Sequence, residues 1–340
     1  MMQHQPSARS QERKSSAQGP PQLHHVIEAQ QFDLKTIETL FELADRMEQV
    51  ARRGGTGEYH GSIMATLFYE PSTRTRFSFE TAMLRLGGRV ISTENAREFS
   101  SVSKGETLED TIRILNGYAD VIVLRHSEVG SAARAAAVSR VPIINGGDGI
   151  GQHATQALRD LYTIRKELGR LSDLRVAMVG DLAQGRTVRS LAYLLSKFRD
   201  IRISFVAPPQ LKMKEDILAH LRARGVAYQE ESDLAKVLDE ADVVYQTRIQ
   251  KERFGDRMDD YEKLKGVYVL DAESLKKMKP KSIIMHPLPR VDEIRMEVDA
   301  DPRAAYFRQA QNGLYVRMAL LTMVLPSPTT PFTPPGARTR

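Results

Sequence analysis

A short polar run after an apolar stretch has the residues to bind an anion. The segment FYEPSTRTRF spans residues 68–77, and its proline separates a predicted strand from a predicted helix. A helix start presents free N–H groups, and the hydroxyls of Ser72, Thr73 and Thr75 add further donors. Arg74 supplies a guanidinium that suits phosphate. Ser and Thr are common helix caps and arginines are often solvated, but this position after a strand and a proline favours a site for a phosphate-like anion.

Further polar side chains follow predicted strands elsewhere. His153 comes after the glycine-rich turn NGGDGIG, and Arg186 and Arg248 follow strand ends in the second half of the chain. A loop histidine is more often an ordinary polar residue, but ligands collect at the carboxyl ends of parallel strands. His126 and His286 are weaker candidates. Neither an HExxH motif nor a dinucleotide-type GxGxxG is present, so we expect neither a metal nor a cofactor.

Parallel strands are needed to bring these residues together. Apolar strand-like runs alternate with amphipathic helical stretches, which is the pattern of βαβ units. We therefore predict an α/β fold of two domains, each a parallel-sheet three-layer α/β/α sandwich, bridged by helices. The predicted strands are 62–69, 89–93, 120–125, 141–145, 174–180, 201–207, 226–229, 242–247, 267–271 and 282–287. The predicted helices are one that ends near residue 86 and those over 107–117, 130–138, 187–198, 214–224 and 232–240.

Two longer helices connect the predicted domains. Residues 153–168 form one predicted helix, with apolar residues at i, i+4, i+7 and i+11 from Ala157. The last helix ends in MALLTMVL, which is apolar enough to pack back against a core. We expect a first domain over 22–152 completed by the helix at 304–325, an interdomain helix at 153–168 and a second domain over 169–303. The polar tails 1–21 and 327–340 are predicted to be disordered.

The composition excludes several classes of protein. The 340 residues are enough for two domains of about 150 residues each. The chain has no cysteine, which excludes disulfides, thiolate metal sites and thiol nucleophiles. Four of the six excess positive charges lie in the tails, which disfavours nucleic-acid binding. No apolar run approaches the roughly 20 residues of a membrane span, and the first 30 residues lack the apolar segment of a signal peptide, so we expect a cytoplasmic protein without a membrane partner.

Seven segments resemble, in order, the motifs of the aspartate/ornithine carbamoyltransferase family. The resemblance covers about residues 25–325 and is nearer to the branch that uses aspartate. The motifs are PSTRTR (71–76), SSVSKGET (100–107), VLRH (123–126), GDGIGQHATQ (147–156), MVGDLAQGRTVRSL (178–191), TRIQKERF (247–254) and MHPLPRVDEI (285–294).

The resemblance implies transfer of the carbamoyl group of carbamoyl phosphate to the amine of L-aspartate, a step of de novo pyrimidine biosynthesis. The first domain is then the carbamoyl-phosphate-binding domain and the second the aspartate-binding domain. Residues matching Ser72, Thr73, Arg74 and Thr75 hold the phosphate in the family, and Arg125 bridges the phosphate and the carbonyl oxygen. His153 and Thr75 also donate to that oxygen, while Gln156 and the backbone carbonyls of Pro287 and Leu288 accept from the carbamoyl NH₂ group.

The same resemblance assigns the aspartate contacts and the assembly. Arg186 and Arg248 match arginines that hold the two carboxylates of aspartate, and bidentate pairs of this kind select a dicarboxylate over a cationic amino acid. Gln250 matches a further aspartate contact. Ser100 and Lys104 match residues that reach into the active site of a neighbouring subunit, with Lys104 also touching aspartate. The resemblance therefore implies a homotrimer with shared sites, with a regulatory or dihydroorotase-like partner left open.

Three alternatives compete with this interpretation. The segment GDLAQGRT (180–187) is one residue from a P-loop, but Arg186 stands in place of the P-loop lysine, which disfavours nucleotide hydrolysis. Ornithine, or an acetylated amino acid, is the nearer rival substrate. The ornithine branch has a cysteine in the motif corresponding to HPLPR, where this chain has Pro287 and no cysteine. A non-catalytic assembly partner would have lost phosphate-site residues, which are all present.

Overall fold

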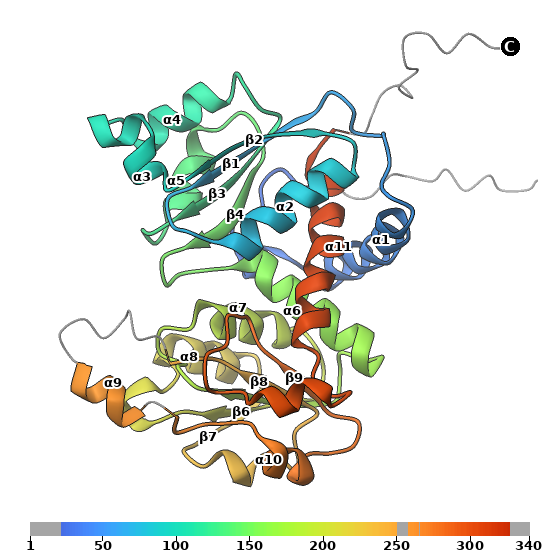
Figure 1. Cartoon of the computed structure of the whole chain (residues 1–340), viewed down its shortest axis with the longest axis vertical. Helices are drawn as coiled ribbons and strands as arrows, with labels where there is room; N and C mark the ends of the chain where they lie inside the picture. The colour runs from blue at the N-terminus through green and yellow to red at the C-terminus, as the bar shows by residue number, and fades with distance from the viewer. Residues whose placement is uncertain (1–21, 250–257, 265, 327–340) are drawn as a thin grey trace, which may run out of the picture.

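The computed structural model describes residues 22–249, 258–264 and 266–326, and it contains two parallel sheets, one in each lobe (Figure 1). The first sheet has the strand order β2-β1-β3-β4 and the second the order β7-β6-β5-β8-β9. Most strands are buried apolar runs, as parallel sheets covered on both faces require. The strands are β1 Ile63–Phe68, β2 Arg89–Glu94, β3 Val121–His126, β4 Ile143–Asp148, β5 Leu174–Val179, β6 Ile201–Val206, β7 Ala227–Glu231, β8 Val243–Gln246 and β9 Ile283–Met285.

Helices flank both sheets, so the predicted two-domain α/β fold is confirmed. The upper lobe in Figure 1 contains α1 Leu34–Arg52, α2 Thr73–Arg85, α3 Ala96–Phe99, α4 Leu108–Leu115 and α5 Ser131–Val138. The lower lobe contains α7 Arg186–Leu195, α8 Glu215–Ala223, α9 Met258–Leu264 and α10 Ala272–Lys277.

Two helices run between the lobes. They are α6 Ala154–Leu168 and α11 Tyr306–Val324 (Figure 1). α6 buries its first eleven residues, polar ones included, and α11 packs against α1, α2 and α6. Side chains of both helices belong to one apolar core that extends into both lobes. None of the helices in the described ranges is long and apolar enough to cross a membrane.

The structure differs from the sequence prediction at several places, and α3, α9 and α10 were not predicted. α1 was not predicted, although Asp33 caps its first turn through the N–H of Thr36 and its apolar face is buried. The helix expected at 232–240 is only a 3-10 turn over Leu234–Lys236, where Asp233 accepts from the N–H of Ala235 and closes a tight turn. The strand expected at 267–271 is reduced to a single bridge between Leu270 and Ile294, because that segment pairs with a loop beyond β9 and not with the sheet.

Candidate functional site

A cleft of about 660 Å³ lies where the two lobes meet. Its walls come from the segments that follow β1, β4, β5, β8 and β9, together with Arg125 near the end of β3. The carboxyl ends of both parallel sheets therefore open onto one space. In each sheet the strand order reverses beside the cleft, between β1 and β3 and between β5 and β8, which is where α/β folds bind ligands.

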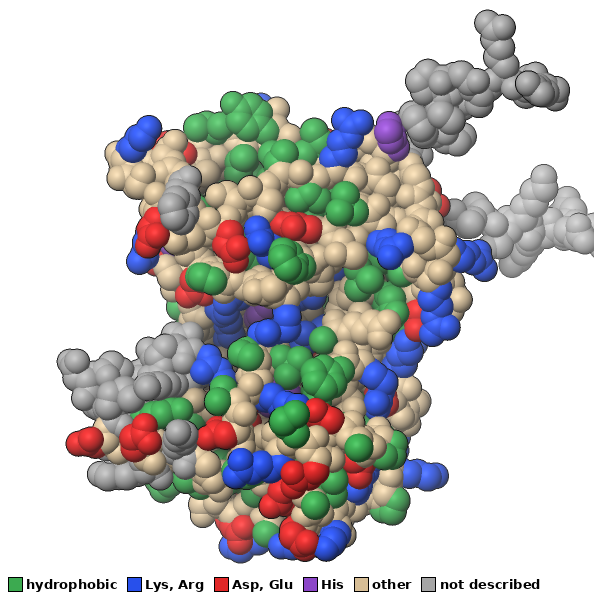
Figure 2. Space-filling model, viewed as in Figure 1, with side chains coloured by type: hydrophobic (Ala, Val, Ile, Leu, Met, Phe, Trp, Pro, Cys, Tyr) green, Lys and Arg blue, Asp and Glu red, His purple; other side chains and the backbone are tan. Residues whose placement is uncertain are grey.

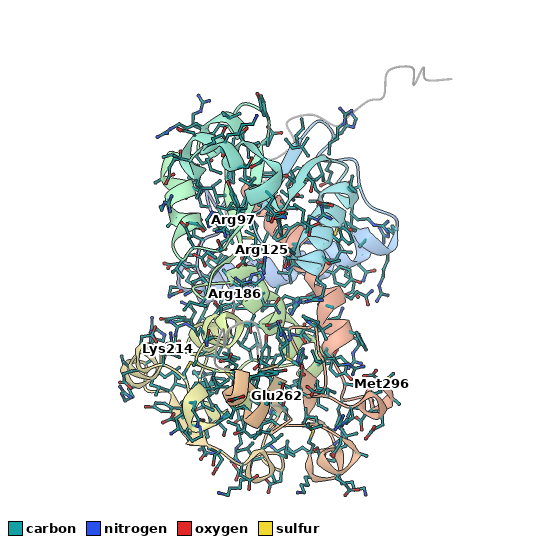
Figure 3. All side chains as sticks on the ribbon, turned by 60° about the vertical axis from the view of Figure 1, so that its left-hand side comes forward. Arg97, Arg125, Arg186, Lys214, Glu262 and Met296 are labelled. Carbon is teal, nitrogen blue, oxygen red and sulfur yellow. The ribbon has the colours of Figure 1, made fainter. Side chains whose placement is uncertain are left out.

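The cleft is strongly cationic. Figure 2 shows Lys or Arg and His side chains in the hollow between the lobes. Among the described residues that line it, one, Glu70, is a carboxylate and six are arginines, namely Arg74, Arg125, Arg159, Arg186, Arg248 and Arg317. Glu70 lies 3.4 Å from Arg125 and 3.8 Å from Arg186, so it balances part of this charge. Figure 3 shows Arg125 and Arg186 near each other at the boundary of the lobes.

Three helix N-termini add to this potential. Thr73 at the start of α2, His153 before α6 and Arg186 at the start of α7 all line the cleft. Their first turns contain no acidic residue, and no side chain caps any of the three starts. The free N–H groups and the positive ends of these helix dipoles therefore face an anion in the cleft.

His153 is a buried, neutral imidazole beside the arginines. Its side chain is 4% exposed, and its backbone N–H donates to the hydroxyl of Ser190 over 3.2 Å. Burial, followed by the charges of Arg186 and Arg125, lowers the pKa of His153 well below its ordinary value. Its Nδ1 atom is buried without a hydrogen-bond partner among the described residues. An uncharged imidazole at this place can donate one hydrogen bond to a ligand without adding charge.

Arg159 and Arg317 also line the cleft, although neither was predicted from the sequence. Arg317 on α11 is buried, donates to the hydroxyl of Ser78 over 2.6 Å, and has a pKa lowered to about 9 by burial and by Arg159. Burial and the same neighbour also lower the pKa of Arg74. These shifts mean that the buried positive charge is under-compensated, and an anion in the cleft would relieve it. The position of Arg317 directly before the apolar run MALLTMVL was the available signal.

The segment after β9 forms part of the cleft wall. Pro287 and Leu288 line it, and Leu288 O accepts from Arg74 over 2.7 Å. Leu288 N–H donates to His286 Nδ1 over 2.8 Å, while His286 Nε2 lies 2.7 Å from Glu293. Burial lowers the pKa of His286, so the neutral ring accepts at Nδ1 and donates at Nε2. This arrangement fixes the direction of the Pro287–Leu288 segment.

Most of the predicted site residues come together in this cleft. Ser100 and Lys104 do not line it: Ser100 bonds the carbonyl of Ala96, and Lys104 is exposed at the end of a 3-10 turn. Gln250 and the predicted tails lie outside the described residues. The loop that resembled a P-loop contributes Arg186 to the wall. The predicted residues that line the cleft are Ser72, Thr73, Arg74, Thr75, Arg125, His153, Gln156, Arg186, Arg248, Pro287 and Leu288.

Comparison with known families gives two adjacent matches. The carbamoyl-P binding domain of aspartate/ornithine carbamoyltransferase matches residues 24–166, and the Asp/Orn binding domain of the same family matches residues 172–324.

Individual relatives agree with these matches. Aspartate carbamoyltransferase 3, chloroplastic, of Pisum sativum is 60% identical over 305 residues, which is 89% of this chain and 78% of the pea protein. The aspartate carbamoyltransferase catalytic subunit of Methanocella arvoryzae is 53% identical over 88% of this chain and 97% of its own. Among solved structures, Trypanosoma cruzi aspartate transcarbamoylase in complex with N-(phosphonacetyl)-L-aspartic acid has a TM-score of 0.84 and 43% identity, covering 89% of this chain and 96% of that one.

Proposed function

Since the chain belongs to the aspartate/ornithine carbamoyltransferase family, we propose that its cleft transfers the carbamoyl group of carbamoyl phosphate to the amine of L-aspartate. The products are N-carbamoyl-L-aspartate and phosphate, as in de novo pyrimidine biosynthesis. The observation that carries the proposal is the cleft itself, in which six arginines and three helix starts meet at the carboxyl ends of both sheets. Relatives named aspartate carbamoyltransferase, at up to 60% identity, support aspartate as the acceptor.

Carbamoyl phosphate is held by the first lobe in this proposal. Ser72, Thr73, Arg74 and Thr75 at the start of α2 bind the phosphate, and Arg125 reaches from β3 to the phosphate and the carbonyl oxygen. The uncapped N-terminus of α2 and its missing acidic residues support this role. The lobe comprises residues 22–152 completed by the helix at 304–325, which packs against α1 and α2.

Aspartate is held mainly by the second lobe, over residues 169–303, beyond the interdomain helix at 153–168. Arg186 and Arg248 pair with its two carboxylates, which disfavours ornithine because its side chain ends in an ammonium group. Gln250 is proposed as a further contact. The proximity of Arg186 to Glu70, at 3.8 Å, supports its position at the junction of the two substrates.

The reaction needs little besides positioning and charge stabilisation. The neutral aspartate amine attacks the carbamoyl carbon, a C–N bond forms, and the C–O bond to phosphate breaks. Arg125, His153 and Thr75 donate to the oxygen that becomes negative in the tetrahedral intermediate, which is the largest contribution in many acyl transfers. The departing phosphate takes the amine proton, so the cleft requires no general base. The neutral state of His153 supports its role as a donor.

A parallel assay tests the substrate assignment. Radiolabelled carbamoyl phosphate is offered with aspartate, ornithine or acetylated ornithine, and labelled products are separated. We expect labelled carbamoyl-aspartate only, and turnover of ornithine without aspartate would overturn the assignment. The control is Arg74→Ala, which should remove turnover by at least about 100-fold because a phosphate donor is lost, while size-exclusion elution stays unchanged.

The assembly is proposed to be a homotrimer in which Ser100 and Lys104 complete a neighbour's site. Their absence from the lining of this chain's own cleft supports the proposal. Mixing inactive Lys104→Ala and Arg74→Ala proteins after mild dissociation should restore activity, because some mixed sites then carry both native residues. Mass measurement of the native assembly checks the trimer and detects any copurifying regulatory or dihydroorotase-like partner. A monomeric mass with full activity would contradict shared sites.

The cytoplasmic location stays a prediction. The pea and Arabidopsis relatives are named chloroplastic, so fractionation of the producing cells is the direct measurement.

A further inference from the structure

One carboxylate lies at the centre of the hydrogen bonds behind the cleft. Asp160 on α6 is fully buried. Its Oδ1 accepts from Gln156 Nε2 over 2.9 Å, from Gln309 Nε2 over 2.7 Å and from Arg159 Nε over 3.0 Å. Its Oδ2 accepts from the hydroxyl of Tyr245 over 2.6 Å. Four side chains from α6, β8 and α11 thus direct their donors to a single anion.

A carboxylate can only accept, so it decides which end of a neighbouring amide faces it. Gln156 must turn its NH₂ group to Asp160, and its carbonyl oxygen Oε1 becomes the end available to the cleft that Gln156 lines. Burial and the Asp160 charge raise the pKa of Tyr245 well above its ordinary value, so that hydroxyl remains a donor. The hydrogen-bond polarity of this network is therefore fixed.

Asp160 also orients Gln309, and through it the segment after β9 that carries further acceptors. Gln309 turns its NH₂ group to Asp160, which leaves its Oε1 to accept from His286 N–H over 2.9 Å. His286 in turn accepts from Leu288 N–H over 2.8 Å, and this bond directs the segment that carries the Pro287 and Leu288 carbonyls. Leu288 O already accepts from Arg74, and a carbonyl has a second lone pair for another donor.

We propose that Asp160 is a positioning residue that makes this part of the cleft an array of acceptors and so selects a donor substrate with an NH₂ group over one with a methyl group. The inference rests on the proposed function. Carbamoyl phosphate carries the NH₂ group, and acetyl phosphate replaces it with a methyl of similar size. A site whose buried acceptors need a hydrogen-bond donor rejects an isostere that cannot supply one.

The test compares the two phosphates as donors to aspartate. Both reactions form a C–N bond and break a C–O bond, so phosphate release measures each with one assay. The readout is the ratio of kcat/KM for carbamoyl phosphate to kcat/KM for acetyl phosphate. Asp160→Asn should lower this ratio about tenfold or more, because an amide at residue 160 lets Gln156 turn its NH₂ group into the cleft.

Tyr245→Phe is the matched control. It removes one donor from the same network and keeps the carboxylate, so the ratio should stay near the wild-type value even if stability falls. A general loss of packing would lower both kcat/KM values together and leave the ratio unchanged. An unchanged ratio in Asp160→Asn, whether or not turnover of carbamoyl phosphate falls, overturns this inference alone.

Gln156→Met keeps the test decisive if Asp160→Asn fails to fold. This variant removes the oriented Oε1 from an intact network, so the ratio should again fall, and a retained ratio overturns the inference. The wild-type protein separates the two proposals. If it transfers the carbamoyl group to aspartate, the proposed function holds whatever the variants do, and if it turns over neither phosphate with aspartate, both proposals are overturned.

Discussion

At the scale of single residues, the cleft holds more positive than negative charge, because Glu70 offsets only part of the charge of the arginines that line it. Burial and the nearby arginines keep His153 neutral, and burial and Arg159 lower the pKa of Arg317 to about 9. A buried cation that nearby carboxylates offset only in part costs folding free energy, so these arginines stabilise a bound anion more than they stabilise the empty protein.

The neutral state of His153 can be checked through pH. Because burial and nearby arginines lower its pKa below 6.5, the ring takes up a proton only well below that pH. His153→Gln keeps a neutral donor at every pH. We therefore expect the ratio of wild-type to His153→Gln kcat/KM to be constant between about pH 6.5 and 8.5, and to fall only at lower pH. A ratio that rises as the pH drops from about 7.5 to 6.5 would mean that the imidazolium is the active form.

Replacing Arg317 should have opposite effects on the stability of the protein and on its affinity for phosphate. Replacing it with Met removes a buried charge that lies over the ring of Phe79 at 4.9 Å. We expect the free energy of unfolding of the empty protein to stay equal or to rise by about 1 kcal/mol. The affinity for phosphate should fall about tenfold, because one cation near the anion is lost. Urea unfolding and phosphate titration measure the two effects, and a large loss of stability with unchanged phosphate affinity would contradict the account.

At the scale of elements, Gly313 on α11 leaves room for the side chains of Arg159 and Arg317. A Cβ atom at Gly313 would lie 2.8 Å from Arg317 Nη1 and 2.9 Å from Arg159 Cδ. Gly313→Ala should add up to about 1 kcal/mol of helix stability while it displaces both side chains. We therefore expect weaker phosphate binding, by about fivefold to tenfold, at equal or higher thermal stability.

The control for Gly313→Ala is Gly117→Ala, where the nearest atom to a new Cβ is Ile114 O at 3.5 Å. Gly117 lies outside the cleft, so this variant should leave phosphate binding unchanged. Isothermal titration with phosphate compares the two variants. Equal affinities for phosphate in both would show that Gly313 does not set the arginine positions.

The elements also show what the sequence could predict. Most of the parallel strands are local apolar runs, so the α/β fold followed from the pattern. The segment 232–240 is equally amphipathic, but Asp233 closes a tight turn there, and such local side-chain bonds compete with a helix. The roles of the site residues that follow the strands were predicted from the family resemblance. Arg159 and Arg317 escaped notice because each lies inside a helix, and only the packing of α6 against α11 brings them to one cleft.

At the scale of the whole molecule, the cleft joins two lobes whose ligand groups face each other. The helix starts at Thr73 and Arg186 come from different lobes, and Glu70 lies within 4.0 Å of arginines from both. A ligand with a phosphonate at one end and two carboxylates at the other would draw the lobes together. We expect the radius of gyration in solution to fall when N-(phosphonacetyl)-L-aspartate is added. Unchanged small-angle scattering at saturation would count against closure, and phosphate alone is the control that should produce a smaller change.

The place of α11 in the chain has a consequence for biosynthesis. A ribosome makes this helix after both sheets, yet Gln309 and Arg317 on it belong to the network and the wall of the cleft. An emerging chain can therefore assemble its strands before it can capture carbamoyl phosphate. A translation product that stops short of α11 lacks the final cation and the support of the acceptor array. Premature termination before α11 should consequently give an inactive product that does not bind and sequester substrate.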